Sequence, residues 1–185
     1  MKEKILVPLD GSKVGEAALP YVENLVTKFL PEPKVEVTLM QVLSSLSHYV
    51  VAGEATARVP YTEQEIQQME KTAMSYLKKA GKSLRDHGAK TKYRVAIGQA
   101  AEEILKAADE LEVDFIAMSS HGRSGLSRWA FGSVTDRVVR GGSKPVLVVT
   151  APKETKEILP SDEYCHKLLF TCFEILVNKL RFFPG

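Results

Sequence analysis

The stretch that decides the fold runs from Asp114 to Val149 and reads DFIAMSSHGRSGLSRWAFGSVTDRVVRGGSKPVLVV. Its apolar run Phe115–Met118 is short and continuous, which is typical of a parallel strand covered on both faces. The run ends in a segment rich in serine and glycine, and Gly132-Ser133 then begins a helical pattern. Glycines let backbone N–H groups approach a ligand closely, and a helix N-terminus presents N–H donors without partners. The stretch therefore predicts an anion site between a strand and a helix, of the kind that holds phosphate oxygens.

Strands and helices alternate along the rest of the chain. The predicted strands before this stretch are Ile5–Leu9, Val35–Leu43 and Lys92–Ile97, and the chain's last strand is Pro145–Val149. Helical spacing of apolar residues predicts helices over roughly 13–29, 62–87, 100–111 and 133–140. The segment Ser44–Tyr61 shows no clear period, and we interpret it as a long loop with room for a short helix. Alternating strands and helices imply right-handed crossovers and a parallel sheet.

One motif in the deciding stretch resembles a known family. The spacing Ser119-x-x-Gly122, nine residues, then Gly132-Ser133 resembles the nucleotide-binding signature of the universal stress protein family. That signature is usually written Gly-x-x-Gly, nine residues, Gly-Ser/Thr, so serine here occupies its first position. The segment Gly122-Arg123-Ser124-Gly125 and the strand Pro145–Val149 also match, and Pro8-Leu9-Asp10-Gly11-Ser12 is similar to the family's first strand and turn. The resemblance covers roughly residues 2–150.

The resemblance implies a fold and a place for a ligand. The expected fold is α/β: a single domain with an open five-stranded parallel sheet of order 3-2-1-4-5 and helices on both faces, plus a C-terminal amphipathic helix predicted by periodicity. In this order the first and fourth strands are neighbours, and the connections leave the first strand in opposite directions. Ligands bind at such a switch point, beyond the carboxyl ends of the strands. Asp10 and Ser119 both lie there.

The resemblance also implies that the ligand is ATP, accompanied by Mg²⁺ or Mn²⁺ because clustered phosphates favour a divalent ion. The base would lie against Pro8 and Val42, and Asp10 would hold the adenosine. The segments Ser119–Gly122 and Gly132–Thr135 would hold the phosphates through backbone N–H groups and hydroxyls. The complete candidate set is Pro8, Leu9, Asp10, Val42, Met118, Ser119, His121, Gly122, Gly132, Ser133, Val134 and Thr135.

Two of these residues have simpler interpretations. Asp10 precedes a predicted helix, where a capping role is the ordinary one, and capping is compatible with a contact to adenosine. A lone His121 without a carboxylate or cysteine cluster is more often structural than catalytic. We therefore assign no catalytic residue and no protein ligand to a metal. The resemblance implies that His121 contacts the phosphate region through its backbone and ring.

The implied function is that of an ATP-binding regulatory protein of the stress response. Two alternatives stay open. One is a slow ATPase or nucleotide transferase, although the sequence shows no constellation for phosphoryl transfer beyond the binding loop. The other is a protein-binding member of the family that binds no nucleotide.

Composition limits the partners and the compartment. The net charge of the 185 residues is only +2 without a basic run, so we expect no nucleic-acid partner. The cysteines Cys165 and Cys172 form no disulfide framework, and neither a signal peptide nor an apolar stretch of about 20 residues is evident. We therefore expect a cytoplasmic protein. The apolar strand Pro145–Val149 would lie at a sheet edge, which together with the resemblance predicts a homodimer.

The chain divides into a predicted nucleotide-binding domain, residues 1–150, and a tail, residues 151–185. In the tail a charged, proline-bounded linker precedes an amphipathic helical pattern. We expect this helix to dock on protein, on its own chain or on a partner subunit, and we do not expect it to contact a membrane.

Overall fold

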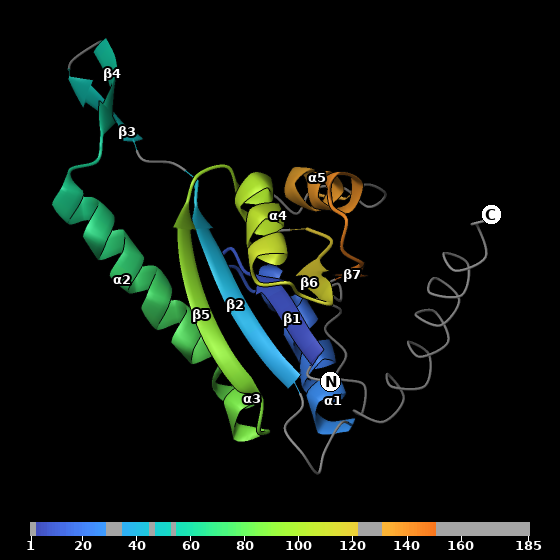
Figure 1. Ribbon diagram of the computed structural model, residues 1–185. Helices are drawn as coiled ribbons and strands as arrows, with labels where there is room; N and C mark the ends of the chain where they lie inside the picture. Colours follow the sequence, from blue (N-terminus) through green and yellow to red (C-terminus); the bar gives the residue numbers. More distant parts are fainter. Residues whose placement is uncertain (1–2, 29–34, 45–46, 53–54, 122–130, 151–185) are drawn as a thin grey trace, which may run out of the picture. The chain divides into compact units, whose positions relative to one another are not determined.

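The computed structural model describes residues 3–28, 35–44, 47–52, 55–121 and 131–150 (Figure 1). A five-stranded sheet contains, in the order in which the strands pair, β5 (Lys90–Ile97), β2 (Val35–Leu43), β1 (Glu3–Pro8), β6 (Phe115–Ser119) and β7 (Val146–Val149). Every pairing in this sheet is parallel. Numbered by chain order within this sheet alone, the strands have the order 3-2-1-4-5, so the predicted topology is confirmed.

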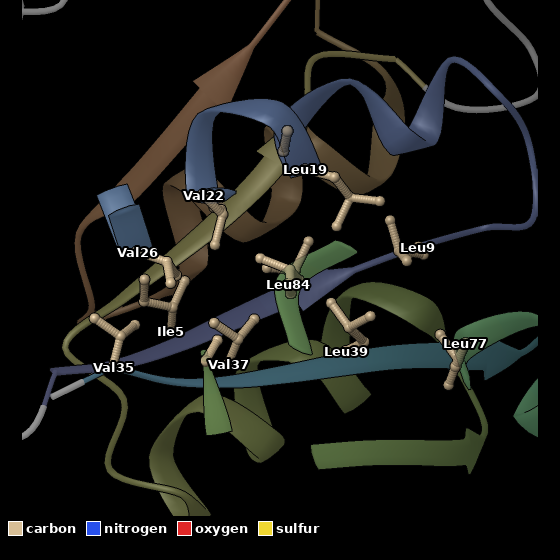
Figure 2. Close-up of a cluster of buried hydrophobic side chains, with 14 of the residues drawn as sticks. Ile5, Leu9, Leu19, Val22, Val26, Val35, Val37, Leu39, Leu77 and Leu84 are labelled. Atoms are coloured by element: carbon tan, nitrogen blue, oxygen red, sulfur yellow. The ribbon is translucent and has the colours of Figure 1, made fainter. Parts of the chain in front are cut away.

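Alternate residues of each strand contribute to the hydrophobic clusters on the two faces of the sheet, because successive side chains of a strand point to opposite sides. Ile5, Val7 and Leu9 belong to one cluster, whereas Leu6 belongs to the other. The first cluster also contains buried residues of α1 (Leu19–Lys28), α2 (Glu63–Ala80) and α3 (Lys82–Asp86), as Figure 2 shows for Val22, Leu77 and Leu84. The second contains residues of α4 (Ala100–Glu110) and α5 (Ser133–Gly141). Helices therefore cover both faces, as predicted.

The second predicted helix starts as expected and ends earlier. Thr62 caps α2 through a capping box with Glu65, the pairing that the spacing indicated. The predicted continuous helix is in fact α2 and the short α3, separated at the buried Gly81. A Cβ at Gly81 would lie 2.8 Å from Leu39 Cδ1 and 3.1 Å from Tyr93 Cε1. Glycine therefore lets this backbone approach the sheet more closely than any other residue would.

The first predicted helix begins later than its amphipathic pattern indicates. A 3₁₀ helix, η1 (Gly15–Ala18), precedes α1, where the sequence predicted one α-helix from about Lys13. Pro20 explains part of this difference, because its nitrogen carries no hydrogen to donate to the carbonyl of Glu16. The α-helical hydrogen-bond series can therefore start only beyond this position.

The predicted loop Ser44–Tyr61 is wrong. Residues of this segment form β3 (Ser47–Ala52) and β4 (Ala55–Pro60), an antiparallel pair that makes up a second, two-stranded sheet. The register joins Ser47 to Pro60 and Ala52 to Ala55, which leaves only two residues to connect the strands. Two-residue connections are the commonest in hairpins, and glycine at the first position suits one of their turn types. The glycine at position 53 is a sequence signal for such a hairpin.

Several predicted features lie outside the described residues. These are Phe29, Gly122 and the entire predicted tail with its amphipathic helix. Within the described part of the chain, no helix combines the length and apolar character that crossing a bilayer requires.

Candidate functional site

The turn after β1 is held by the side chain of Asp10. The carboxylate oxygen Oδ1 accepts hydrogen bonds from the backbone N–H of Ser12 at 3.0 Å and from its hydroxyl at 2.7 Å. Between them Gly11 has a φ of 85°, a left-handed conformation that glycine adopts without strain. The hydroxyl oxygen of Ser12 in turn accepts from the N–H of Gly15 at 3.0 Å. Asp10 therefore orders the turn, while Ser12 satisfies the first N–H of η1.

Gly15 is a residue of this turn that the sequence analysis missed. It is buried, and a Cβ built on it would overlap Asp10 Oδ1. Any side chain at this position would displace the carboxylate that holds Ser12. Because a glycine inside an apolar helical pattern gives no sign of what it faces, only the structure shows this role.

The end of β6 and the start of α5 are joined directly. The N–H of Gly132 donates to the carbonyl of Ser120 at 2.8 Å, and the hydroxyl of Thr135 donates to the carbonyl of Ser119 at 2.9 Å. The N–H of Ser120 donates to the carbonyl of Val149 in β7 at 2.7 Å. The helix N-terminus therefore lies at the carboxyl end of β6, although residues 122–130 between them lie outside the described part.

Serine is well accommodated at the first motif position. Ser119 ends β6 in a strand conformation and does not have a positive φ, so its backbone does not require glycine. Its side chain is buried, and its hydroxyl oxygen accepts from the N–H of His121 at 3.4 Å. The replacement of the usual glycine therefore leaves the local backbone intact.

The N-terminus of α5 has the features of an anion site. Gly132 is the N-cap residue, and no side chain caps the helix within the described residues. The first N–H groups of a helix have no partner inside it. Ser133 is exposed there and Val134 is half-buried. Asp136 places a negative charge in the first turn, but Arg140 pairs with its carboxylate at 2.8 Å, which moderates repulsion of an anion.

Two predicted side-chain contacts are modified by the structure. The hydroxyl of Thr135 is buried and donates its hydrogen to Ser119, so Ser133 carries the hydroxyl of this pair that faces solvent. Leu9 belongs to the first hydrophobic cluster, so only its backbone is open to a ligand contact. Its N–H donates to the carbonyl of Met40 at 2.8 Å and extends the pairing of β1 with β2.

The remaining candidates lie near the ends of the central strands. Val42 packs against the second cluster, Met118 is a buried member of it, and Pro8 is half-buried at the end of β1. The imidazole of His121 shares a hydrogen bond through Nδ1 with the Ser120 hydroxyl at 3.0 Å. Its Nε2 is buried without a partner in the described part of the chain. An orphaned ring nitrogen beside the β6–α5 junction fits a ligand that supplies the missing hydrogen bond.

Metal binding by side chains alone has little support here. Within the described residues, no three His, Cys, Asp or Glu side chains come together in a way that could hold a metal ion. Arg137, in the second turn of α5, donates a hydrogen bond of 3.3 Å to Gln99 at the start of α4.

A parallel sheet of this order, with helices on both faces, defines a doubly wound α/β protein. In proteins of this class ligands bind at the switch point, beyond the carboxyl ends of the strands. The universal stress protein family model matches residues 1–150, and the chain belongs to this family.

Relatives support the same assignment. The universal stress protein MJ0577 of Methanocaldococcus jannaschii is 33% identical over 156 residues, which are 80% of this chain and 95% of that protein. Its solved structure matches with a TM-score of 0.63 at 31% identity and covers 83% of this chain and 99% of that one.

Two more distant structures show the same fold with ligands present. A universal stress protein of Archaeoglobus fulgidus in complex with dAMP has a TM-score of 0.52 at 18% identity, covering 80% of this chain and 98% of that one. A family protein of Arabidopsis thaliana with AMP bound has a TM-score of 0.53 at 16% identity, covering 88% of this chain and 99% of that one. At these identities the likeness concerns the fold alone.

Proposed function

We propose that this protein binds an adenine nucleotide, ATP with Mg²⁺ or Mn²⁺, at the carboxyl ends of β1 and β6 and acts as a regulatory protein of the stress response. Residues 1–150 form the binding domain, and the tail is an appendage to it. The phosphates lie at the N-terminus of α5, and the adenosine lies beside Asp10 and Val42.

One observation carries this proposal. The hydrogen bonds Gly132–Ser120 and Thr135–Ser119 place the N-terminus of α5, which no described side chain caps, at the end of the fourth strand of the sheet. Backbone N–H groups and the positive end of the helix dipole favour negative charge at such a place. The neighbouring strand β1 ends in the turn that Asp10 orders, so a polar side chain lies across the switch point from the anion site.

The nature of the ligand is supported by the family. Solved proteins of this fold include one in complex with dAMP and one with AMP bound. A triphosphate adds charge that a divalent ion neutralises, and Mg²⁺ is usually bound by substrate phosphates, water and one or two carboxylates. Phosphates and water would therefore supply most ligands of the ion here.

The decisive experiment identifies the small molecule that the purified protein carries. The protein is denatured, and the released compound is identified by mass spectrometry; calorimetric titrations of the nucleotide-free protein with ATP, AMP and GTP follow. We expect an adenine nucleotide in the first measurement and a preference for ATP in the second. No release together with no binding would contradict the proposal and support the alternative of a member with an empty pocket. Steady turnover of bound ATP would support the slow ATPase.

We also propose that two copies associate through the edge strand Pro145–Val149. Among the described strands of the main sheet, β7 pairs with β6 alone, and it carries four consecutive apolar residues. The opposite edge strand, β5, carries Lys90, Lys92 and Arg94, which form ion pairs with Glu36 and Glu110. Charged side chains protect a sheet edge from pairing, so β7 is the edge that remains suited to a second chain.

A further inference from the structure

Tyr76 connects α2 to the helix that follows the Asp10 turn. Its hydroxyl donates a hydrogen bond of 3.1 Å to Glu16 Oε1 in η1, across 60 residues of sequence. The other carboxylate oxygen of Glu16 pairs with Lys13 at 2.8 Å. Glu16 is therefore held from two sides, by a cation of its own segment and by a hydroxyl of a distant helix.

Besides burial, the charge of Asp10 in the turn also affects the pKa of the Tyr76 hydroxyl. Burial raises the pKa of Tyr76, and the negative charges of Glu16 and Asp10 raise it further, whereas a backbone hydrogen bond from Gly11 acts in the opposite direction. The protonated hydroxyl is thus the stable form, and it can donate to Glu16 throughout the neutral range. The hydrogen bond from Tyr76 to Glu16 and the hydrogen bonds of the turn Asp10–Gly15 meet at the peptide bond between Gly15 and Glu16. We call these residues together the Tyr76 latch.

This unit controls the position of a short and tightly packed segment. Asp10 Oδ1 holds Ser12, and Ser12 holds Gly15, the residue directly before Glu16. A Cβ built on Gly15 would lie 2.2 Å from Asp10 Oδ1, so a side chain there would force the carboxylate to move. Releasing Glu16 would therefore loosen the start of η1 and, through Gly15 and Ser12, the carboxylate of Asp10.

We propose that Tyr76 and Glu16 are positioning residues that hold the Asp10 turn in the conformation that receives the adenosine. The inference rests on the proposed function, because it concerns the affinity of the same site. Nucleotide affinity would then depend on a residue of α2 as well as on the strand ends and the N-terminus of α5.

The chain provides a matched control for the Tyr76 hydroxyl. The rings of Tyr76 and Tyr93 both pack against the first hydrophobic cluster, but the Tyr93 hydroxyl accepts a hydrogen bond from Arg85 rather than contacting the turn. Phenylalanine at either position keeps the ring and removes one hydroxyl. The two variants therefore differ in which connection is lost, not in how much apolar packing is lost.

The first test compares dissociation constants for ATP by titration calorimetry. We expect Tyr76→Phe to weaken binding about fivefold, the usual value of one hydrogen bond, and Tyr93→Phe to leave it unchanged. In an Asp10→Ala background, Tyr76→Phe should cause no additional loss, because the side chain that it positions is already absent. Equal losses in both backgrounds, or an unchanged affinity of Tyr76→Phe, would overturn the positioning role.

The second test needs no nucleotide and separates this inference from the proposed function. Amide hydrogen exchange of Ser12 and Gly15, whose N–H groups bond to Asp10 and Ser12, is measured in the ligand-free protein. We expect faster exchange in Tyr76→Phe and not in Tyr93→Phe. Unchanged exchange would show that the latch does not hold the turn, even if ATP binds. If the wild-type protein binds no nucleotide, the proposed function fails, and the exchange rates still decide whether the latch exists.

Discussion

The hydroxyl of Thr135 donates a 2.9 Å hydrogen bond to the carbonyl of Ser119, and both side chains are buried. These residues are 16 positions apart, at the two ends of the connection from β6 to α5. Ser119 is the last residue of β6, and Thr135 is the third residue of α5. Together with the bond from Gly132 to Ser120, this bond holds the first turn of α5 at the end of the strand.

Thr135→Val tests this relationship. Valine keeps the branched shape of threonine but leaves the buried carbonyl of Ser119 without this donor, so we expect a loss of about 1–3 kcal/mol in the free energy of unfolding. ATP affinity should fall as well, because the start of α5 is less firmly placed. Urea denaturation and calorimetry measure the two effects. Thr27→Val is the control: it removes an exposed hydroxyl bonded to Asn24 within α1 and should change the stability and the ATP affinity only slightly. A Thr135→Val protein as stable as the wild type would show that the bond does not fix the helix.

Gly132→Val tests the phosphate site. A β-branched side chain at the N-cap would occupy space that we assign to phosphate oxygens, so we expect ATP affinity to fall at least about tenfold, or 1.4 kcal/mol. Ser143→Val places the same side chain just beyond the other end of α5 and should leave the affinity unchanged. Circular dichroism checks that both variants fold. An unaltered dissociation constant in folded Gly132→Val would remove the assignment of the phosphates to this helix.

The sequence predicted where the switch point of this site lies, but not the hydrogen bonds that hold the site together. The strand ends and the segment rich in small residues could be predicted, because parallel strands, glycine-rich connections and helix starts each have a local sequence pattern. The bonds from Thr135 to Ser119 and from Tyr76 to Glu16 have no local pattern, since each depends on how segments far apart in the chain pack. The same limit explains Gly15, whose need for glycine comes from the position of Asp10.

Gln41→Met tests a buried polar atom near the end of β2. Gln41 is only 8% exposed, and its Oε1 has no hydrogen-bond partner in the described part of the chain. Methionine has a similar length and no unsatisfied oxygen, so we expect the free energy of unfolding to rise by about 1 kcal/mol. Gln68→Met on the exposed surface of α2 is the control and should have little effect. Marked destabilisation by Gln41→Met would mean that a water molecule or a ligand pairs with the oxygen.

The order and the limits of the main-sheet strands were largely predictable, whereas the hairpin β3–β4 was not. Strand β2 was predicted with its observed limits, Val35–Leu43, and its first seven residues are buried in an unbroken run. Strands β3 and β4 were missed because they form a separate hairpin in a segment whose sequence shows no clear period. A two-stranded sheet buries little apolar surface, so its sequence shows no strong alternation of apolar and polar residues.

Val148→Lys tests the proposed dimer. A lysine in the middle of β7 would place charge on the edge that we expect to pair with a second chain, so the protein should shift toward monomer in sedimentation velocity. Ile97→Lys is the matched control, because Ile97 ends the opposite edge strand β5 and is partly exposed. It should leave the assembly unchanged. A wild-type protein that is monomeric at high micromolar concentration would contradict the dimer directly.

The tail is tested by removing residues 161–185. Its sequence has an apolar stripe of Leu168, Leu169, Cys172, Phe173, Leu176, Val177 and Leu180. A helix of this length is marginal by itself, and so large a stripe is unfavourable in water, so we expect it to dock on its own domain or on a partner subunit. Every residue assigned to the nucleotide precedes Ala151, and the family model ends at residue 150. The truncated protein should therefore bind ATP with the wild-type dissociation constant, while its solubility or its dimer dissociation constant changes. Loss of ATP binding in a truncated protein that still folds would show that the tail belongs to the binding unit and that the boundary near residue 150 is wrong.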